Sequence, residues 1–253
     1  MRERLYIASI SEDAPAIAVQ YGIGMELDHY CMAENMDGKN LEQTDKQVRK
    51  DTAAVTKLLF HAPFNELSPA AIDPRIREIA YERYEQAYRL AKEHYGIEKM
   101  IVHSGYVPRV YYKSWHHERS LEFWKTYMKN KPDHFQICIE NVMEDEPYMM
   151  VRLAEELEDP RIGLCLDIGH ANCAGREPVK KWIQCMGPYI THLHIHNNNG
   201  EHDSHQALPS GTIDMISALE LIDRYCPKEA TVTIESRDGR TSLEWMDKEG
   251  VLK

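Results

Sequence analysis

Eight short apolar segments alternate along this chain with stretches of amphipathic helical pattern. Regular alternation of strands and helices is typical of a parallel sheet with helices packed on its outer face. We predict strands at residues 4–10, 22–27, 56–61, 99–103, 135–140, 162–167, 190–196 and 230–235. We predict helices at residues 12–20, 40–54, 73–95, 117–130, 145–158, 177–186 and 212–225, with a shorter last helix at 242–249.

The predicted helix at 73–95 has the clearest pattern, with apolar residues three and four positions apart and Gly96 where a helix commonly ends. Eight strand–helix units in 253 residues match a (β/α)8 TIM barrel, which typically takes about 250 residues. We therefore expect an α/β protein with a single TIM-barrel domain over residues 1–253. A doubly wound open sheet is the alternative, but it usually carries a glycine-rich loop after its first strand. Here the sequence from Ile10 to Asp13 contains no glycine.

Side chains that can bind metal end most of the predicted strands. His61, His103, Glu140, Asp167 and Glu235 each follow an apolar run. The active site of a TIM barrel lies at the carboxyl ends of its strands, so these side chains should meet at one mouth. One such residue alone is more typical of a rim hydrogen bond or a helix cap. Together they predict a metal site, because buried carboxylates need cations.

Two loop motifs extend this set. DIGH at 167–170 adds His170, and HDSH at 202–205 adds Asp203 and His205. Mixed imidazole and carboxylate ligands suit zinc or manganese better than calcium. We expect one to three divalent ions per chain.

The predicted strand at 190–196 carries three histidines on one face, because successive side chains of a strand point to opposite sides. They are His192, His194 and His196. Cys138 and Cys165 lie two residues before Glu140 and Asp167. We expect these two thiols to point into the barrel and fill its interior.

The motifs, taken in order, resemble those of the xylose isomerase-like TIM-barrel superfamily, which contains sugar-phosphate isomerases and epimerases as well as endonuclease IV. The resemblance covers about residues 56–236. The motifs are HAPF at 61–64, VHSG at 102–105, IEN at 139–141, LDIGH at 166–170, HLHIHNN at 192–198, HDSHQALPSGTID at 202–214 and TIES at 233–236.

The resemblance implies two overlapping sets of ligands. In the isomerases and epimerases two glutamates, an aspartate and a histidine hold one divalent metal, and the glutamates also serve as acid and base. The matching residues are Glu140, Asp167, His194 and Glu235. In endonuclease IV the set extends to three metals. The matches are His61 and His103 with a bridging Glu140, then Asp167, His194 and Glu235, then His170, Asp203 and His205.

Three candidate activities follow from this resemblance. We favour a divalent-metal-dependent isomerase or epimerase of a sugar or sugar phosphate, with Glu140 and Glu235 as the catalytic acid–base pair. The alternative is an endonuclease IV-like hydrolase of phosphoesters, and a lyase on the same scaffold is a further one. For a hydrolase, a small phosphorylated substrate fits better than abasic DNA. Phe64, Asn65 and Glu66 stand where endonuclease IV has residues that wedge into DNA.

Charge and composition bear on the partners of the protein. The net charge of −11 argues against a nucleic-acid partner, although bound cations would offset part of it. Arg109, His196 and Arg237 are candidate substrate contacts. The chain has no apolar run long enough for a membrane span or a signal peptide, and its six cysteines lack CxxC spacing. We therefore expect a cytoplasmic protein without a membrane partner, and the resemblance implies a small-molecule sugar or sugar-phosphate substrate.

Overall fold

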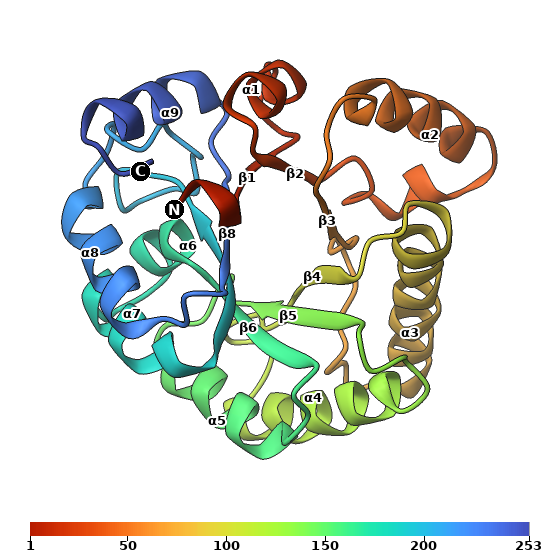
Figure 1. Ribbon diagram of the computed structural model, residues 1–253. Coiled ribbons are helices and arrows are strands. Elements are labelled where there is room, and N and C mark those ends of the chain that lie inside the picture. The colour runs from red at the N-terminus through yellow and green to blue at the C-terminus, as the bar shows by residue number, and fades with distance from the viewer. Residues whose placement is uncertain (253) are drawn as a thin grey trace.

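The computed structural model describes residues 1–252, and within them the strands form one closed parallel barrel in the order β1 to β8 (Figure 1). The strands are β1 Leu5–Ala8, β2 Gly24–Leu27, β3 Leu58–His61, β4 Lys99–His103, β5 Gln136–Glu140, β6 Ile162–Asp167, β7 Ile190–Ile195 and β8 Thr231–Ile234. The barrel closes because β8 pairs with β1, with Val232 opposite Leu5 and Ile234 opposite Ile7. The predicted TIM barrel is therefore confirmed.

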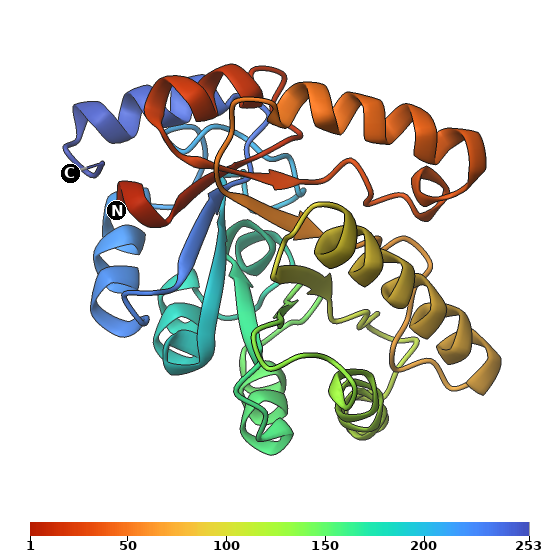
Figure 2. The ribbon, with the colours of Figure 1, turned by 45° about the vertical axis from the view of Figure 1, so that its right-hand side comes forward.

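Helices follow the strands along the chain and cover the outside of the barrel (Figure 2). They are α1 Ala14–Tyr21, α2 Gly38–Thr52, α3 Pro74–Arg89, α4 Lys113–Met128, α5 Tyr148–Leu157, α6 Ile168–Cys173, α7 Val179–Met186, α8 Met215–Tyr225 and α9 Gly239–Lys248. The helix predicted at 73–95 is α3 with a π-helical turn at Leu90–His94, and it ends before Gly96, which has a φ of 69°. None of the helices within residues 1–252 combines the length and the apolar composition that a membrane span requires.

The short helix α6 is not among the predicted helices. It begins directly after Asp167, whose side chain accepts a hydrogen bond from the backbone N–H of His170 at 2.7 Å. This contact is a helix cap, so Asp167 ends a strand and starts a helix at once. The six residues of α6 are too few to show a helical period in the sequence.

The strands pack side chains on two sides. Residues on their outer side join the helices in a large apolar core, in which Trp124 and Trp182 are fully buried. Inside the barrel a smaller apolar cluster contains both predicted inward thiols. Its members are Tyr6, Leu59, Ile101, Cys138 and Cys165. The rest of the interior is polar and fully buried, with Glu26 from β2, His192 and His194 from β7, and Thr233 from β8.

A long loop, residues 196–214, connects β7 to α8 at the carboxyl end of the barrel. Asn197 organises this loop. Its side-chain amide donates to the backbone oxygens of Leu208 at 2.8 Å and Ile213 at 3.1 Å. Its backbone forms an antiparallel bridge with that of Gln206. This bridge closes the segment that contains Asp203 and His205 into a loop beside the barrel mouth.

Two tryptophans provide a test of the outer core. Trp182 in α7 is fully buried, whereas Trp115 in α4 is 45% exposed. Because Trp182→Ala leaves a cavity, we expect it to lower the free energy of unfolding by about 3–5 kcal/mol. Trp115→Ala should lower it by less than about 1 kcal/mol. Denaturant unfolding followed by circular dichroism measures both, and equal losses would contradict this assignment of the core.

Candidate metal centre at the barrel mouth

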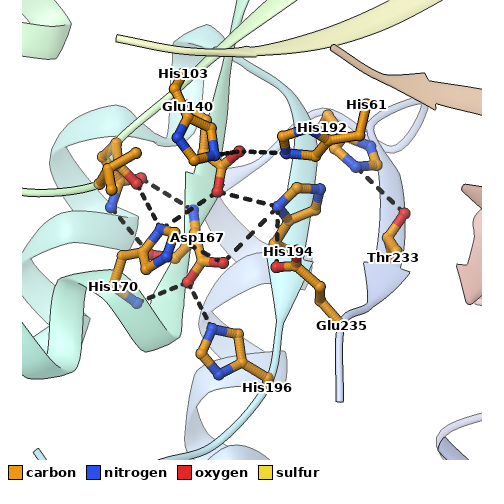
Figure 3. Close-up of polar contacts among 12 residues, drawn as sticks. His61, His103, Glu140, Asp167, His170, His192, His194, His196, Thr233 and Glu235 are labelled. Atoms are coloured by element: carbon orange, nitrogen blue, oxygen red, sulfur yellow. Dashed lines mark hydrogen bonds and ion pairs between the residues drawn. The ribbon is translucent and has the colours of Figure 1, made fainter. Parts of the chain in front are cut away.

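The residues that end the strands gather at one end of the barrel (Figure 3). His61 ends β3, His103 ends β4, Glu140 ends β5 and Asp167 ends β6, while His194 lies near the end of β7. The remaining predicted ligands lie in α6, directly after β8 and in the loop 196–214. They are His170, Glu235, Asp203 and His205. The parallel strands thus bring all the predicted ligands to one mouth.

His194 lies at the centre of this cluster, and its side chain is fully buried. Its Nδ1 atom is 3.2 Å from Glu140 Oε1, 3.3 Å from Glu235 Oε2 and 3.8 Å from Asp167 Oδ2. Its Nε2 atom, on the other side of the ring, is 2.9 Å from Glu26 Oε1. Three carboxylates therefore surround one ring nitrogen, and we call these four residues at the mouth, without Glu26, the central group.

A second group of ligand atoms lies beside Glu140. The Oε2 atom of Glu140 is 3.2 Å from His61 Nε2 and 3.5 Å from His103 Nε2. The Nδ1–H of His61 donates to the backbone oxygen of Ala62 at 2.9 Å, so in the neutral ring the Nε2 lone pair faces Glu140. Because its other oxygen belongs to the central group, Glu140 bridges the two groups.

A third group forms around Asp203. Its Oδ2 atom is 3.2 Å from His170 Nε2 and 3.0 Å from His205 Nε2. The Nδ1 atoms of these rings donate to backbone oxygens, His170 to Asn141 at 2.9 Å and His205 to Glu235 at 2.7 Å. His205 holds a left-handed φ of 46°, which costs a non-glycine residue about 1 kcal/mol. In this strained backbone conformation, the imidazole ring of His205 points at Asp203.

The donor atoms of the cluster fit a divalent cation. Asp167 Oδ2 and Glu235 Oε2 are buried without a hydrogen-bond partner, which is costly unless a cation lies beside them. Imidazole lone pairs that face carboxylate oxygens likewise require a proton or a cation between them. Imidazole nitrogens and carboxylate oxygens are the ligands that zinc and manganese accept.

The two glutamates of the central group differ in protonation. Burial raises the pKa of Glu235 to about 8, against the opposing effect of His194. Burial also acts to raise the pKa of Glu140, but the surrounding imidazoles, above all His194 and His103, hold it well below its usual range. The environments of the two glutamates therefore shift their pKa values in opposite directions.

A cavity of about 490 Å³ opens over this cluster. One side is polar and contains His103, His170, Asp203, His205 and Glu235. The other side is largely apolar. It includes Phe64, Leu67, Tyr106, Val107, Tyr111, Val142 and Met143. The ring of Phe64 stacks on that of His103, with 4.1 Å between ring centres, and so joins the two sides. The cavity has the volume of a small-molecule site.

The three predicted substrate contacts lie elsewhere than expected. Arg109 is exposed in the loop after β4 and does not line the 490 Å³ cavity. Arg237 is exposed and lines a separate cavity of about 260 Å³ beside Asp238 and Arg240. His196 is fully buried, with Nε2 3.2 Å from Asp167 Oδ1 and 3.5 Å from Asp203 Oδ1. Its ring therefore belongs with the third group rather than with a substrate surface.

The place of Glu26 near the end of the second predicted strand predicts a residue that lines the pocket, and the structure gives it a different part. Its side chain is fully buried below the central group and contacts both His192 and His194. The signal was available, because Glu26 is a carboxylate in an apolar segment, as Glu140 and Glu235 are. What the sequence did not reveal is its depth, since β2 places Glu26 within the barrel and not in the cavity lining.

Together, the fold and the cluster define a TIM barrel with a centre of buried histidines and carboxylates at its mouth. A model of the family described as xylose isomerase-like TIM barrel matches residues 16–249. The chain belongs to this family, as its motifs predicted.

Related proteins extend this result. The protein MJ1311 of Methanocaldococcus jannaschii is 29% identical over 199 residues, covering 74% of this chain and 67% of that protein. A D-tagatose 3-epimerase-like protein superposes with a TM-score of 0.77 at 23% identity, over 98% of both chains. The TTHB071 protein from Thermus thermophilus, soaked with zinc chloride, gives 0.73 at 22% identity, over 98% of this chain and 97% of that one. At these identities the structural likeness shows the fold.

Gly169 provides a test of the third group. A Cβ atom at this position would lie 2.0 Å from Cε1 of His196, so Gly169→Ala must displace that ring. We expect this variant to bind less zinc than the wild type, because His196 and its neighbours His170 and Asp203 lose their alignment. Metal content by mass spectrometry measures this, with circular dichroism as the control for folding. Unchanged zinc content in a folded variant would contradict the prediction.

Proposed function

We propose that this chain is a divalent-metal-dependent isomerase or epimerase of a sugar, with Glu140 and Glu235 as its acid–base pair. The proposed metal ligands are Glu140, Asp167, His194 and Glu235. The observation that carries the proposal is the central group, in which both glutamates reach the same ring nitrogen of His194, at 3.2 and 3.3 Å. They arrive from β5 and from the end of β8, so they approach the mouth from different strands.

The unequal pKa values of the glutamates suit them to proton transfer. Acid and base roles follow where environments push the pKa values of two carboxyl groups apart. When bound, a divalent metal would polarise a substrate carbonyl and make the adjacent C–H more acidic. The ionised Glu140 would take that proton, and the neutral Glu235 would donate one to the opposite face or to the neighbouring carbon. Microscopic reversibility exchanges the two roles in the reverse direction.

The cavity supports a sugar-sized substrate. Its polar side offers the imidazoles of His103, His170 and His205 to substrate hydroxyl groups. The likeness to a D-tagatose 3-epimerase-like protein supports a sugar, and the likeness to a zinc-soaked protein supports a metal.

A specific observation favours a second candidate, which is hydrolysis of a small phosphoester by a metal cluster. The second and third groups are assembled as completely as the central one, with His61 and His103 on Glu140 and with His170 and His205 on Asp203. Isomerase chemistry needs only the central group. Two or three metal ions would instead clamp the attacking and leaving oxygens of a phosphoester.

Variants of the two kinds of group distinguish these candidates. If the proposal holds, Glu140→Gln and Glu235→Gln should each lower kcat on the active ketose by about 10²- to 10⁴-fold, because each removes a proton-transfer group. Asp203→Asn should have a smaller effect, since Asp203 lies outside the central group. The assay is incorporation of solvent deuterium next to the carbonyl, over a panel of ketoses and ketose phosphates.

The same preparations decide the outcome through their metal content. About one ion per chain together with deuterium incorporation supports the isomerase. About three zinc ions per chain, phosphate release from phosphoesters and loss of that release in Asp203→Asn would replace it with the hydrolase. A wild-type protein that takes up no metal would overturn both candidates.

Metal uptake should depend on pH. Burial raises the pKa of Glu235 to about 8, and Asp203 raises the pKa of His205 to about 9 against the opposing effect of burial. Both groups therefore hold their protons at pH 7 in the metal-free protein, and a bound metal must displace them. We expect zinc affinity to rise from about pH 6 to about pH 9 and then to level off.

Calorimetry in buffers of different ionisation enthalpy counts the protons released with each zinc ion. Glu235→Gln should release fewer protons than the wild type, because its amide has none to lose. Zinc affinity that stays constant across this pH range, without proton release, would contradict the prediction.

A further inference from the structure

Glu26 is a fully buried carboxylate that the proposed chemistry does not use. Both of its carboxylate oxygens accept hydrogen bonds from side chains of β7 and β8 that point into the barrel. Its Oε1 atom is 2.9 Å from His194 Nε2. Its Oε2 atom is 3.1 Å from His192 Nε2 and 2.5 Å from the hydroxyl of Thr233. The carboxylate is thus tied to the one histidine of the central group.

The donors and acceptors of this network can be followed from Lys99, at the end far from Glu26. The ammonium of Lys99 is only a donor, and it lies 3.2 Å from the hydroxyl oxygen of Thr231. That hydroxyl can then donate either to His192 Nδ1, at 2.7 Å, or to the backbone oxygen of Thr191, at 3.4 Å, and the shorter contact is the one to His192. With Nδ1 accepting, the proton of the neutral His192 ring is on Nε2 and points at Glu26.

The hydrogen bond between Glu26 and His194 decides which ring nitrogen of His194 carries the proton. An ionised carboxylate is an acceptor only, so Glu26 requires a proton on Nε2 of His194. The Nδ1 atom is then the atom that offers a lone pair, and it is the one that faces Glu140, Asp167 and Glu235. The network therefore aims one particular nitrogen at the mouth of the barrel.

We propose that Glu26 is a positioning residue, which holds His194 with its proton on Nε2 and its Nδ1 lone pair directed at the divalent ion. This inference rests on the proposed function insofar as His194 is a metal ligand. Metal-binding histidines commonly donate their other N–H to a carboxylate, which fixes the ring and its tautomer. An inert filler would need no charge at this depth, whereas Glu26 is a carboxylate with a donor on each oxygen.

Glu26→Gln tests the proposal because it keeps the shape and removes one acceptor. Three donors then face two side-chain atoms, of which only the amide oxygen accepts. We expect zinc affinity to fall by about 10- to 100-fold, measured by competition with a chromophoric chelator. Long-range ¹H–¹⁵N spectra of the zinc-loaded protein should place the His194 proton on Nε2 in the wild type, with this signal shifted or split in the variant.

Glu144→Gln is the matched control. Glu144 is also a buried glutamate near the mouth, but it accepts from Ser104 and from the backbone N–H of Val142, not from a proposed ligand. The zinc affinity of the Glu144→Gln variant should stay within about twofold of the wild-type value. A second pair guards against misfolding, because Thr233→Val removes a donor to Glu26 and Thr233→Ser keeps it. We expect the valine variant to bind zinc more weakly than the wild type, and the serine variant to keep the wild-type zinc affinity.

The outcomes separate this inference from the proposed function. A wild-type protein that binds no zinc overturns both. A wild type that binds zinc, with Glu26→Gln equal to it in affinity and in the His194 spectrum, overturns the positioning role alone. Should Glu26→Gln not fold, the Thr233 pair decides, and equal affinities of its two members would overturn the role of Glu26.

Discussion

Carboxylates buried at one end of the barrel, each in contact with imidazole, impose the constraint that shapes the rest of this structure. Glu140, Asp167 and Glu235 are almost completely buried, and a buried carboxylate is stable only beside donors or cations. The histidines meet this need in a common way. One ring nitrogen of His61, His170 and His205 donates to a backbone oxygen, and the other faces a carboxylate. For His194 the fixed partner is Glu26 instead. Each ring is therefore held before any ion is bound.

The barrel supports this arrangement by dividing its interior. The apolar cluster inside it, with Leu59, Ile101 and Cys165 among its members, comes from strands that include β3, β4 and β6. The inward side chains of β2, β7 and β8 are polar and fully buried, as Glu26, His192 and Thr233 illustrate. The outer core between strands and helices supplies the apolar burial that offsets this polar interior. The barrel can hold charge inside because most of its apolar packing lies outside.

The cavity above the centre joins a polar floor to an apolar wall. Phe64 and Tyr111 from the loops after β3 and β4 form part of that wall. Among the described residues that line it, none is a lysine or arginine. A phosphate group in this cavity would therefore depend on bound cations rather than on a basic side chain. An uncharged sugar needs no such partner and can place its C–H faces against the wall.

The sequence alone determined the order of the strands and helices, because apolar runs and helical periods are local properties. It also predicted that the side chains of His61, His103 and Glu140 meet at one end of the barrel, since each closes an apolar run. Only the tertiary structure decided which residues far apart in the sequence come into contact and where the loop side chains lie. Arg109 and Arg237 lie in loops near the right strands, yet their side chains lie outside the cavity, because a loop's course depends on its own packing. Glu26 and His194 are separated by 168 residues and meet only because the closed barrel brings β2 and β7 across a shared interior. Which nitrogen of His194 faces the mouth is fixed by that contact, and no local pattern in the sequence encodes it.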